Sequence, residues 1–210
     1  MKRFLAFAAG LLLATSALAQ NVQFPATQPG PPGQQSVWVQ GGIGSNVKTY
    51  RLAVAANTWA TLGEFVQIGG SATKTVRIQR ITVGGAATAA VGTPIIVKRE
   101  TSAISGGTCA SQAANIAPVD NTNATAATAT VNLCTAAPTA GTATFTMDSC
   151  RLLVAAVAAG TPDICAFSYG TNNDQPLTFT KSATDFVGLT NTVSFGSGGV
   201  LDLMVEWTEE

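Results

Sequence analysis

The chain has 210 residues, of which eleven are basic and eleven acidic, so only 10% of its side chains are charged. It contains no histidine, which excludes Ser-His-Asp and Cys-His catalysis, histidine-ligated zinc and histidine proton shuttles. A net charge near zero does not favour a nucleic acid or an anionic membrane surface as a partner.

The first nineteen residues have the pattern of a secretory signal peptide. Lys2 and Arg3 precede an apolar run over residues 4–13, and small residues end the segment at Ala19. The run is about half of the roughly 20 residues that a membrane-spanning helix needs, so we expect no membrane span. We predict that residues 1–19 are removed and that the protein is exported to the periplasm, the cell surface or the extracellular medium.

Residues 20–36 are rich in proline, glutamine and glycine, and they predict an extended tether ahead of one domain over residues 37–210. The alternating segment 35–40 comes directly after the prolines. A strand on a flexible lead pairs within its own sheet, which is the default, or adds to the edge of a neighbouring copy.

Period-two alternation of apolar and polar residues dominates the rest of the chain, and glycine pairs interrupt it. Residues 200–208 form the clearest pattern, with Leu203 and Trp207 on the apolar face. In residues 75–83 the alternation slips by one position at Gln79-Arg80, which predicts a β-bulge. The other predicted strands are 47–55, 64–68, 95–100, 129–134, 142–147, 151–156, 164–169, 177–180 and 187–195.

These segments predict an all-β fold, because no long stretch has a helical period with caps. About ten short strands separated by turns are typical of an antiparallel β-sandwich, and we expect a jelly-roll-like one.

The four cysteines predict two disulfides, since an even number in an exported chain is typical of a disulfide framework. Three pairings are possible. We favour Cys109–Cys134, which brackets a polar loop, and Cys150–Cys165, which brackets a predicted hairpin. Each closed loop would contribute about 3 kcal/mol of stability.

Two kinds of short pattern could carry chemistry, and each has a simpler interpretation. Residues 71–74 match S-x-x-K of penicillin-recognising enzymes, but they lead into a strand and the accessory motifs are missing, so a turn is favoured. Residues 120–123 and 172–174 carry oxygen ligands that suit Ca²⁺ without EF-hand spacing, and such residues also favour turns. We predict no catalytic residue, no metal and no cofactor.

Trp38 and Trp59 are the candidates for contact with a ligand or with a second copy of the chain, because both lie near the N-terminal edge of the domain. Aromatic rings of this kind stack on sugars and anchor interfaces. A role in the core or in a self-interface is the preferred interpretation of each, and Trp207 is assigned to the core.

Six short stretches of the chain form a recognisable set: 70–78, 97–99, 101–102, 105–108, 201–203 and 206–210. Together they resemble a family of small β-rich structural proteins of tailed bacteriophages, over roughly residues 50–210. The resemblance implies a virion-associated or surface-decorating β-sandwich, oligomeric and without enzymatic activity. The signal peptide and the cysteines depart from that family and indicate a cellular or repurposed relative, since virions assemble in a reducing cytoplasm.

Three classes of function follow, in order of preference. The first is a non-enzymatic, exported structural or surface protein that forms a homo-oligomer, with a trimer favoured. The second is a secreted module that binds carbohydrate or another component of the cell envelope through Trp38 or Trp59. An enzyme is the least favoured, because no catalytic constellation stands out in the sequence.

Overall fold

The structure is a computed structural model that describes residues 47–120, 125–154, 163–170 and 175–210. The predicted signal peptide, the tether and Trp38 lie outside the described residues, as do most of the two loops considered for Ca²⁺. The described residues belong to one compact unit that extends from Gly44 to Glu210.

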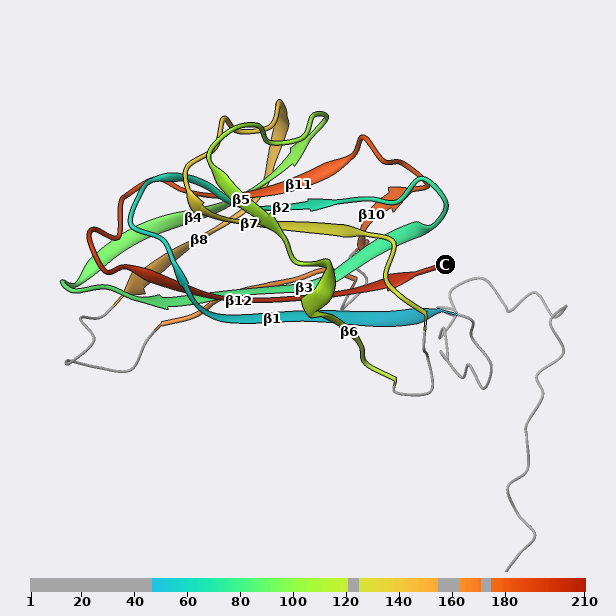
Figure 1. The fold of residues 1–210 in the computed structure, drawn as a ribbon, viewed down its shortest axis with the longest axis horizontal. Coiled ribbons are helices and arrows are strands. Elements are labelled where there is room, and N and C mark those ends of the chain that lie inside the picture. Colours follow the sequence, from blue (N-terminus) through green and yellow to red (C-terminus); the bar gives the residue numbers. More distant parts are fainter. Residues whose placement is uncertain (1–46, 121–124, 155–162, 171–174) are drawn as a thin grey trace, which may run out of the picture. The chain divides into compact units, whose positions relative to one another are not determined.

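Twelve strands and one short 3-10 turn, η1 (Ala113–Asn115), make up this unit (Figure 1). In the described part of the chain no helix is long and apolar enough to cross a membrane. The strands are β1 (Lys48–Thr58), β2 (Gly63–Gly69), β3 (Thr75–Ala86), β4 (Val91–Glu100), β5 (Thr108–Ser111), β6 (Ile116–Pro118), β7 (Thr130–Ala136), β8 (Ala143–Val154), β9 (Cys165–Ser168), β10 (Leu177–Thr180), β11 (Phe186–Asn191) and β12 (Val200–Glu209).

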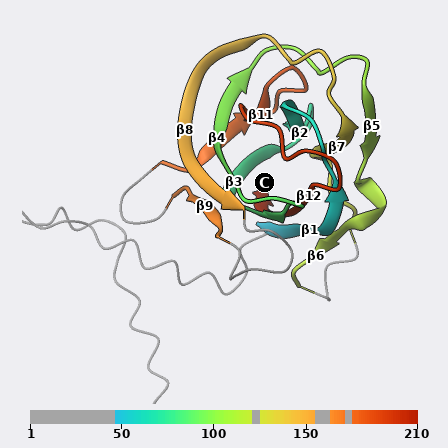
Figure 2. The same cartoon turned by 90° about the vertical axis from the view of Figure 1, so that its left-hand side faces the viewer.

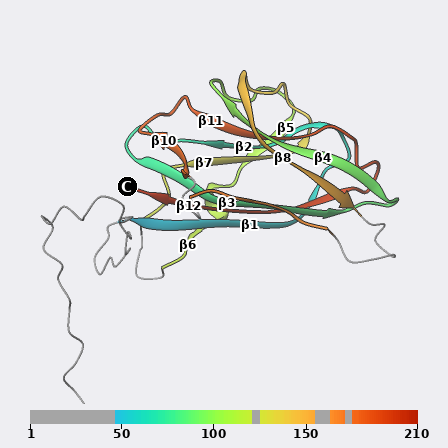
Figure 3. The same ribbon diagram turned by 180° about the vertical axis from the view of Figure 1, so that it is seen from behind.

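The strands form two antiparallel sheets that pack face to face, as Figures 1 and 3 show from opposite sides. Sheet A has the order β10-β3-β12-β1-β6, and β9 also pairs with β3. Sheet B has the order β5-β7-β2-β11-β4-β8. The predicted all-β sandwich is therefore confirmed.

The strand pairs are nested, which makes the sandwich a jelly roll. β1 pairs with β12, β2 with β11, β3 with both β9 and β10, and β4 with β8. This is the pairing of one long hairpin whose two arms are rolled together over the core, so successive strands alternate between the sheets. β9 and β10 continue each other along β3, and together they serve as a single interrupted strand.

Between β4 and β8 the chain adds three strands that widen both sheets on the same side (Figure 2). β6 pairs with the edge of β1, whereas β7 pairs with β2 and in turn carries β5. The added strands cover edges that an eight-stranded jelly roll would leave open. Sequence patterning predicted β7 but missed β5 and β6, which are short and carry no buried alternation.

One hydrophobic core fills the space between the sheets. Trp207 is fully buried, as predicted, and its ring stacks on that of Tyr50 with a centroid separation of 5.9 Å. The indole Nε1 of Trp207 donates to Glu209 Oε1 at 3.0 Å, and the same carboxylate accepts from the backbone N–H groups of Thr128 and Ala129. The buried charge is thus fully hydrogen-bonded, as a buried carboxylate requires.

The predicted bulge in β3 is present. Glu206 of β12 pairs with Arg80, and the next residue, Trp207, pairs with Ile78, so Gln79 is the extra residue. The bulge restores Ile78 and Ile81 to the core side, where both are buried. The segments predicted as strands 142–147 and 151–156 belong to one continuous strand, β8, as far as the described residues reach.

Both predicted disulfides are formed, but one of them joins different structural elements from those expected. Cys109 and Cys134 are cross-strand partners on the adjacent strands β5 and β7. Cys150 lies on β8 of sheet B and Cys165 on β9 of sheet A, so the hairpin predicted between them is wrong. This bond joins the two sheets at the side opposite the added strands (Figure 2).

Replacing Cys150 and Cys165 together with alanine is expected to lower the free energy of unfolding by about 3 kcal/mol, because the unfolded chain loses a closed loop. Urea unfolding under oxidising conditions measures the change. The Cys109 and Cys134 double alanine variant is the matched control, with a similar loss from loop closure. A loss below about 1 kcal/mol for the first variant would contradict an energetic role for the link between the sheets.

A buried carboxyl pair beneath a flap

A second β-bulge creates an acidic cluster on the outer face of sheet B. Val66 of β2 pairs with Leu189 of β11, but the next pair along is Glu64 with Thr190, so Phe65 is the extra residue. Phe65 and Val66 both point into the core, and the bulge therefore leaves Glu64 and Gln67 on the same, outer face.

Glu64 and Glu100 converge over a glycine. Glu100 ends β4, and Gly188 of β11 lies between the two acidic residues. A Cβ at Gly188 would lie 2.5 Å from Glu100 Oε1 and 2.7 Å from Glu64 Oε1, so both oxygens occupy the space that a side chain would fill. The exposed fraction is 1% for Glu64 and 0% for Glu100.

In each carboxyl group Oε2 accepts a hydrogen bond from a defined donor, while Oε1 has no donor. Glu64 Oε2 accepts from the backbone N–H of Gly141 at 3.1 Å, and Glu100 Oε2 accepts from Gln67 Nε2 at 2.7 Å. The two Oε1 atoms are buried without a hydrogen-bond partner when both groups are taken as ionised. Buried polar atoms in native proteins are nearly always paired, so these two unpartnered acceptors are exceptions that need a physical explanation.

Gln67 also forms hydrogen bonds with the backbone of the segment that covers the cluster. Its Nε2 donates to the carbonyl of Ser102 at 3.1 Å, and its Oε1 accepts from the N–H of Ile104 at 3.0 Å. Residues 101–107, which follow β4, and residues 137–142, which precede β8, together lie over the pair, and we call these two segments the flap.

The two segments of the flap are hydrogen-bonded to each other. Ser105 and Thr139 exchange backbone hydrogen bonds of 3.1 and 2.7 Å. Nearer the sheet, the N–H of Thr101 donates to the carbonyl of Thr142 at 3.0 Å, and the N–H of Thr142 donates to Ser102 Oγ at 2.8 Å. These bonds join the two segments of the flap into one unit.

The electrostatics of the cluster favour a protonated carboxyl group. Burial raises the pKa of Glu64 to about 8, and the negative charge of Glu100 and a hydrogen bond with it act in the same direction. The N–H of Gly141 and the positive charge of Lys98 oppose the shift. Two buried carboxylates this close resist ionising together, and one proton between them relieves both the repulsion and the missing hydrogen bonds.

The cluster is closed to substrates. A glycosidase pair must leave room for a sugar or a water molecule between its carboxyl groups, whereas these two are covered by the flap and nearly unexposed. Among the residues that the structure describes, no three His, Cys, Asp or Glu side chains gather as a metal site would require. The hydrogen bonds of Glu64 and Gln67 instead hold the flap against sheet B.

The structure corrects the ligand role considered for Trp59. Its exposed fraction is 0%, its Nε1 donates to Asn191 Oδ1 at 3.0 Å, and its ring contacts that of Phe65. Trp59 is thus a core residue and presents no face to a ligand or to a second copy, whereas Trp38 lies outside the described residues.

Residues 71–74 form the predicted turn. Ser71 Oγ accepts from the N–H groups of Thr73 and Lys74, both at 3.2 Å, immediately before β3 begins. The hydroxyl is used to cap the turn, as is common for serine.

The sequence pattern did not predict the carboxyl pair, because the pair depends on the β-bulge at Phe65. Strict alternation places residues 64 and 67 on opposite faces of a strand. One signal was available: Phe65-Val66 are two consecutive large apolar residues between polar ones, which is what a bulge in a half-buried strand produces.

The edge formed by β8 is the second surface that stands out. Among the described strands, β8 pairs with β4 alone, and most of its twelve side chains are exposed, among them Phe145 at 55% and Leu153 at 56%. Register shifts break the pairing near Met147 and Thr144, so residues 148–154 form the regular part. The other described edge strands, β5, β6, β9 and β10, are no longer than four residues each.

No protein-family model, no curated protein and no solved structure matches this chain.

Proposed function

We propose that the protein is a non-enzymatic structural or surface protein that is exported and forms a homo-oligomer, with a trimer favoured, similar in role to virion-associated β-sandwich proteins of bacteriophages. The observation that carries the proposal is the β8 edge, where two large apolar side chains are exposed on a long, sparsely charged strand. A long free edge with apolar residues is a template for another chain.

The composition of β8 supports a second copy as its partner. Asp148 and Arg151 are its only charged residues, and the strand lacks the lysines and prolines that commonly keep an edge from pairing. The short edges elsewhere offer too few backbone groups for a stable added strand. Self-association through β8 is also compatible with the disulfide at Cys150, which fixes this strand to sheet A.

The solution mass of residues 20–210 with intact disulfides, measured by light scattering after gel filtration, tests the proposal. We expect a mass above that of the monomer, and we expect Phe145→Lys and Leu153→Lys to reduce it because a charge at a buried interface is costly.

Leu62→Lys and Val119→Lys are the matched controls, since these apolar residues are similarly exposed, at 59% and 52%, but lie outside β8. A monomer at every concentration would refute self-association. Equal dissociation by the control variants would refute the assignment of the interface to β8.

The alternative is a module that binds carbohydrate or another envelope component, and one surface feature favours it. A hollow of about 190 Å³ lies on the outer face of sheet A, lined by Gly84, Ile164, Asp202 and Met204 among others. An apolar wall beside one carboxylate fits the mixed character of a sugar. A glycan screen with the unmodified protein and with Met204→Lys discriminates the two functions: binding that this variant abolishes would support the module.

A further inference from the structure

We propose that Glu64 and Glu100 share a single proton and form a latch that keeps the flap closed over sheet B, so that the flap opens as the pH rises. The inference does not depend on the proposed function. It rests on two unpartnered, converging oxygens that are buried beneath a cover bonded to the same side chains.

One proton completes the hydrogen bonding of the cluster. If Glu64 is protonated, its Oε1–H donates to Glu100 Oε1, and each oxygen that lacked a partner gains one. The two Oε2 atoms keep the N–H of Gly141 and the amide of Gln67 as donors. In this state every carboxyl oxygen of the pair is satisfied, as burial requires.

The charges around the pair also fit one proton. A singly protonated pair carries one negative charge, and Lys98, which lies beside Gly188 on the same face of β4, supplies one positive charge. A cation in place of the proton would face that lysine, and only two carboxylates are present to hold it, fewer ligands than Ca²⁺ requires.

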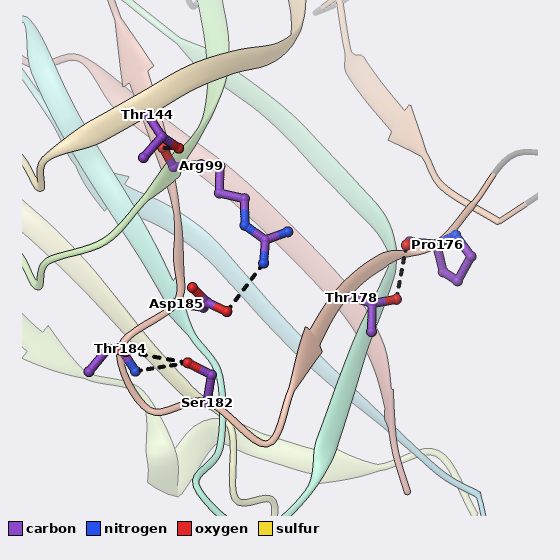
Figure 4. A network of polar contacts seen from close by, with 7 residues as sticks. All are labelled: Arg99, Thr144, Pro176, Thr178, Ser182, Thr184 and Asp185. Atoms are coloured by element: carbon purple, nitrogen blue, oxygen red, sulfur yellow. Dashed lines mark hydrogen bonds and ion pairs between the residues drawn. The ribbon is translucent and has the colours of Figure 1, made fainter.

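Among the described residues, Lys98 is the charged side chain that faces the cluster from the elements packed on it, whereas Arg151 of β8 pairs with Pro94, six residues before Glu100 on β4. The flap, β7 and β11 contain no titratable residue, and β2 contributes only Glu64. Arg99 is on the opposite face of β4, where its Nη2 lies 3.2 Å from Asp185 Oδ2 (Figure 4). Its guanidinium also covers the ring of Phe179. Asp148 of β8 pairs with Val97, a core residue, and so also points away.

The latch works because the open and closed states bind different numbers of protons. With the flap closed the pKa of Glu64 is about 8, whereas an open flap exposes the carboxyl group to water and returns its pKa towards 4.5. Between these values the closed state holds a proton that the open state has lost, so each unit of pH favours opening by about tenfold. Above about pH 8 both states are ionised and the dependence ends.

Amide hydrogen exchange of the mature protein with intact disulfides tests the latch. The N–H groups of Gly141 and Ile104 report the flap, and the N–H of Trp59, which donates to the carbonyl of Gly199, reports the core. We expect the protection factors of the first two to fall about tenfold per pH unit from about pH 5 to about pH 8. The protection factor of Trp59 should be higher than theirs at every pH, because its exchange requires the core to open.

Glu64→Gln is the decisive variant, because an amide keeps the shape of a protonated carboxyl group and does not titrate. Its flap protection should be independent of pH over the same range, whereas Glu206→Gln, a control on the outer face of sheet A, should retain the wild-type slope. A pH-independent wild-type flap, or an unchanged slope in Glu64→Gln, would overturn the proposal.

Infrared spectroscopy of the unmodified protein gives a second readout that does not require the variant to fold. The carbonyl band of a protonated carboxyl group should be present at about pH 6 and lost above about pH 8. Its absence at about pH 6 overturns the latch. Added Ca²⁺ that increases the protection of Gly141 would also overturn it, because the pair would then be a cation site.

Discussion

Replacing Trp59 with alanine is expected to lower the free energy of unfolding by about 3–5 kcal/mol, the range found when a large aromatic side chain is removed from a core. The ring is fully buried against Phe65, and its N–H occupies Asn191 Oδ1, which also accepts from the N–H of Gly63. The variant leaves both a cavity and a buried acceptor with one donor fewer. Urea unfolding monitored by circular dichroism measures the loss.

Leu62→Ala is the matched control, because Leu62 is three residues away and mostly exposed, and it should change stability by less than about 0.5 kcal/mol. Trp59→Phe should be intermediate, since it restores most of the volume but not the hydrogen bond to Asn191. If Trp59→Ala were as stable as the wild type and had lost only a ligand, the core assignment would be wrong.

The stability of the wild-type protein is expected to fall by about 4 kcal/mol as the pH rises from about 5 to about 8, at about 1.4 kcal/mol per unit. The sign follows from Glu64, whose pKa is near 4.5 in the unfolded chain and about 8 in the folded protein. Over this range the folded protein binds one more proton than the unfolded chain, so raising the pH favours unfolding. The stabilisation is complete below about pH 4.5 and is lost through about pH 8.

Urea unfolding at a series of pH values measures this slope in the wild type, in Glu64→Gln and in Glu206→Gln. Glu64→Gln should show little change with pH and should be the more stable protein at about pH 8, because it carries no second buried charge. The control should follow the wild type. A wild-type stability that increases with pH over this interval would contradict the shared proton.

Patterning identified ten of the twelve strands and missed two short ones. The eleven predicted segments all correspond to observed strands, two of them to β8, because period two is set mainly by a core on one face. β5 and β6 have no such face. They exist because β7 and β1 offer them backbone partners, which depends on the tertiary structure and leaves no local pattern.

The two bulges show the same limit. The bulge at Gln79 was predicted because the alternation resumed after it over several residues. The bulge at Phe65 lies near the start of β2, so too few residues precede it for an interrupted alternation to be recognised. The carboxyl pair that depends on it could not be placed without the flap, which buries the outer face of β2.

The disulfides were paired correctly for an incomplete reason. Separation along the chain favoured Cys150–Cys165, but it carries no information on which sheet each cysteine occupies. Only the rolled topology places β8 and β9 in different sheets at the same side of the sandwich.

The nested strand order also sets the timing of folding. β12, the last strand of the chain, is in the middle of sheet A, where it pairs with both β3 and β1. Sheet A therefore stays split until residues 200–209 have been synthesised, and contacts between the first and last strands must close a loop of nearly the whole domain. Such non-local topologies fold slowly. Completion of sheet A is thus expected to be a late step of folding.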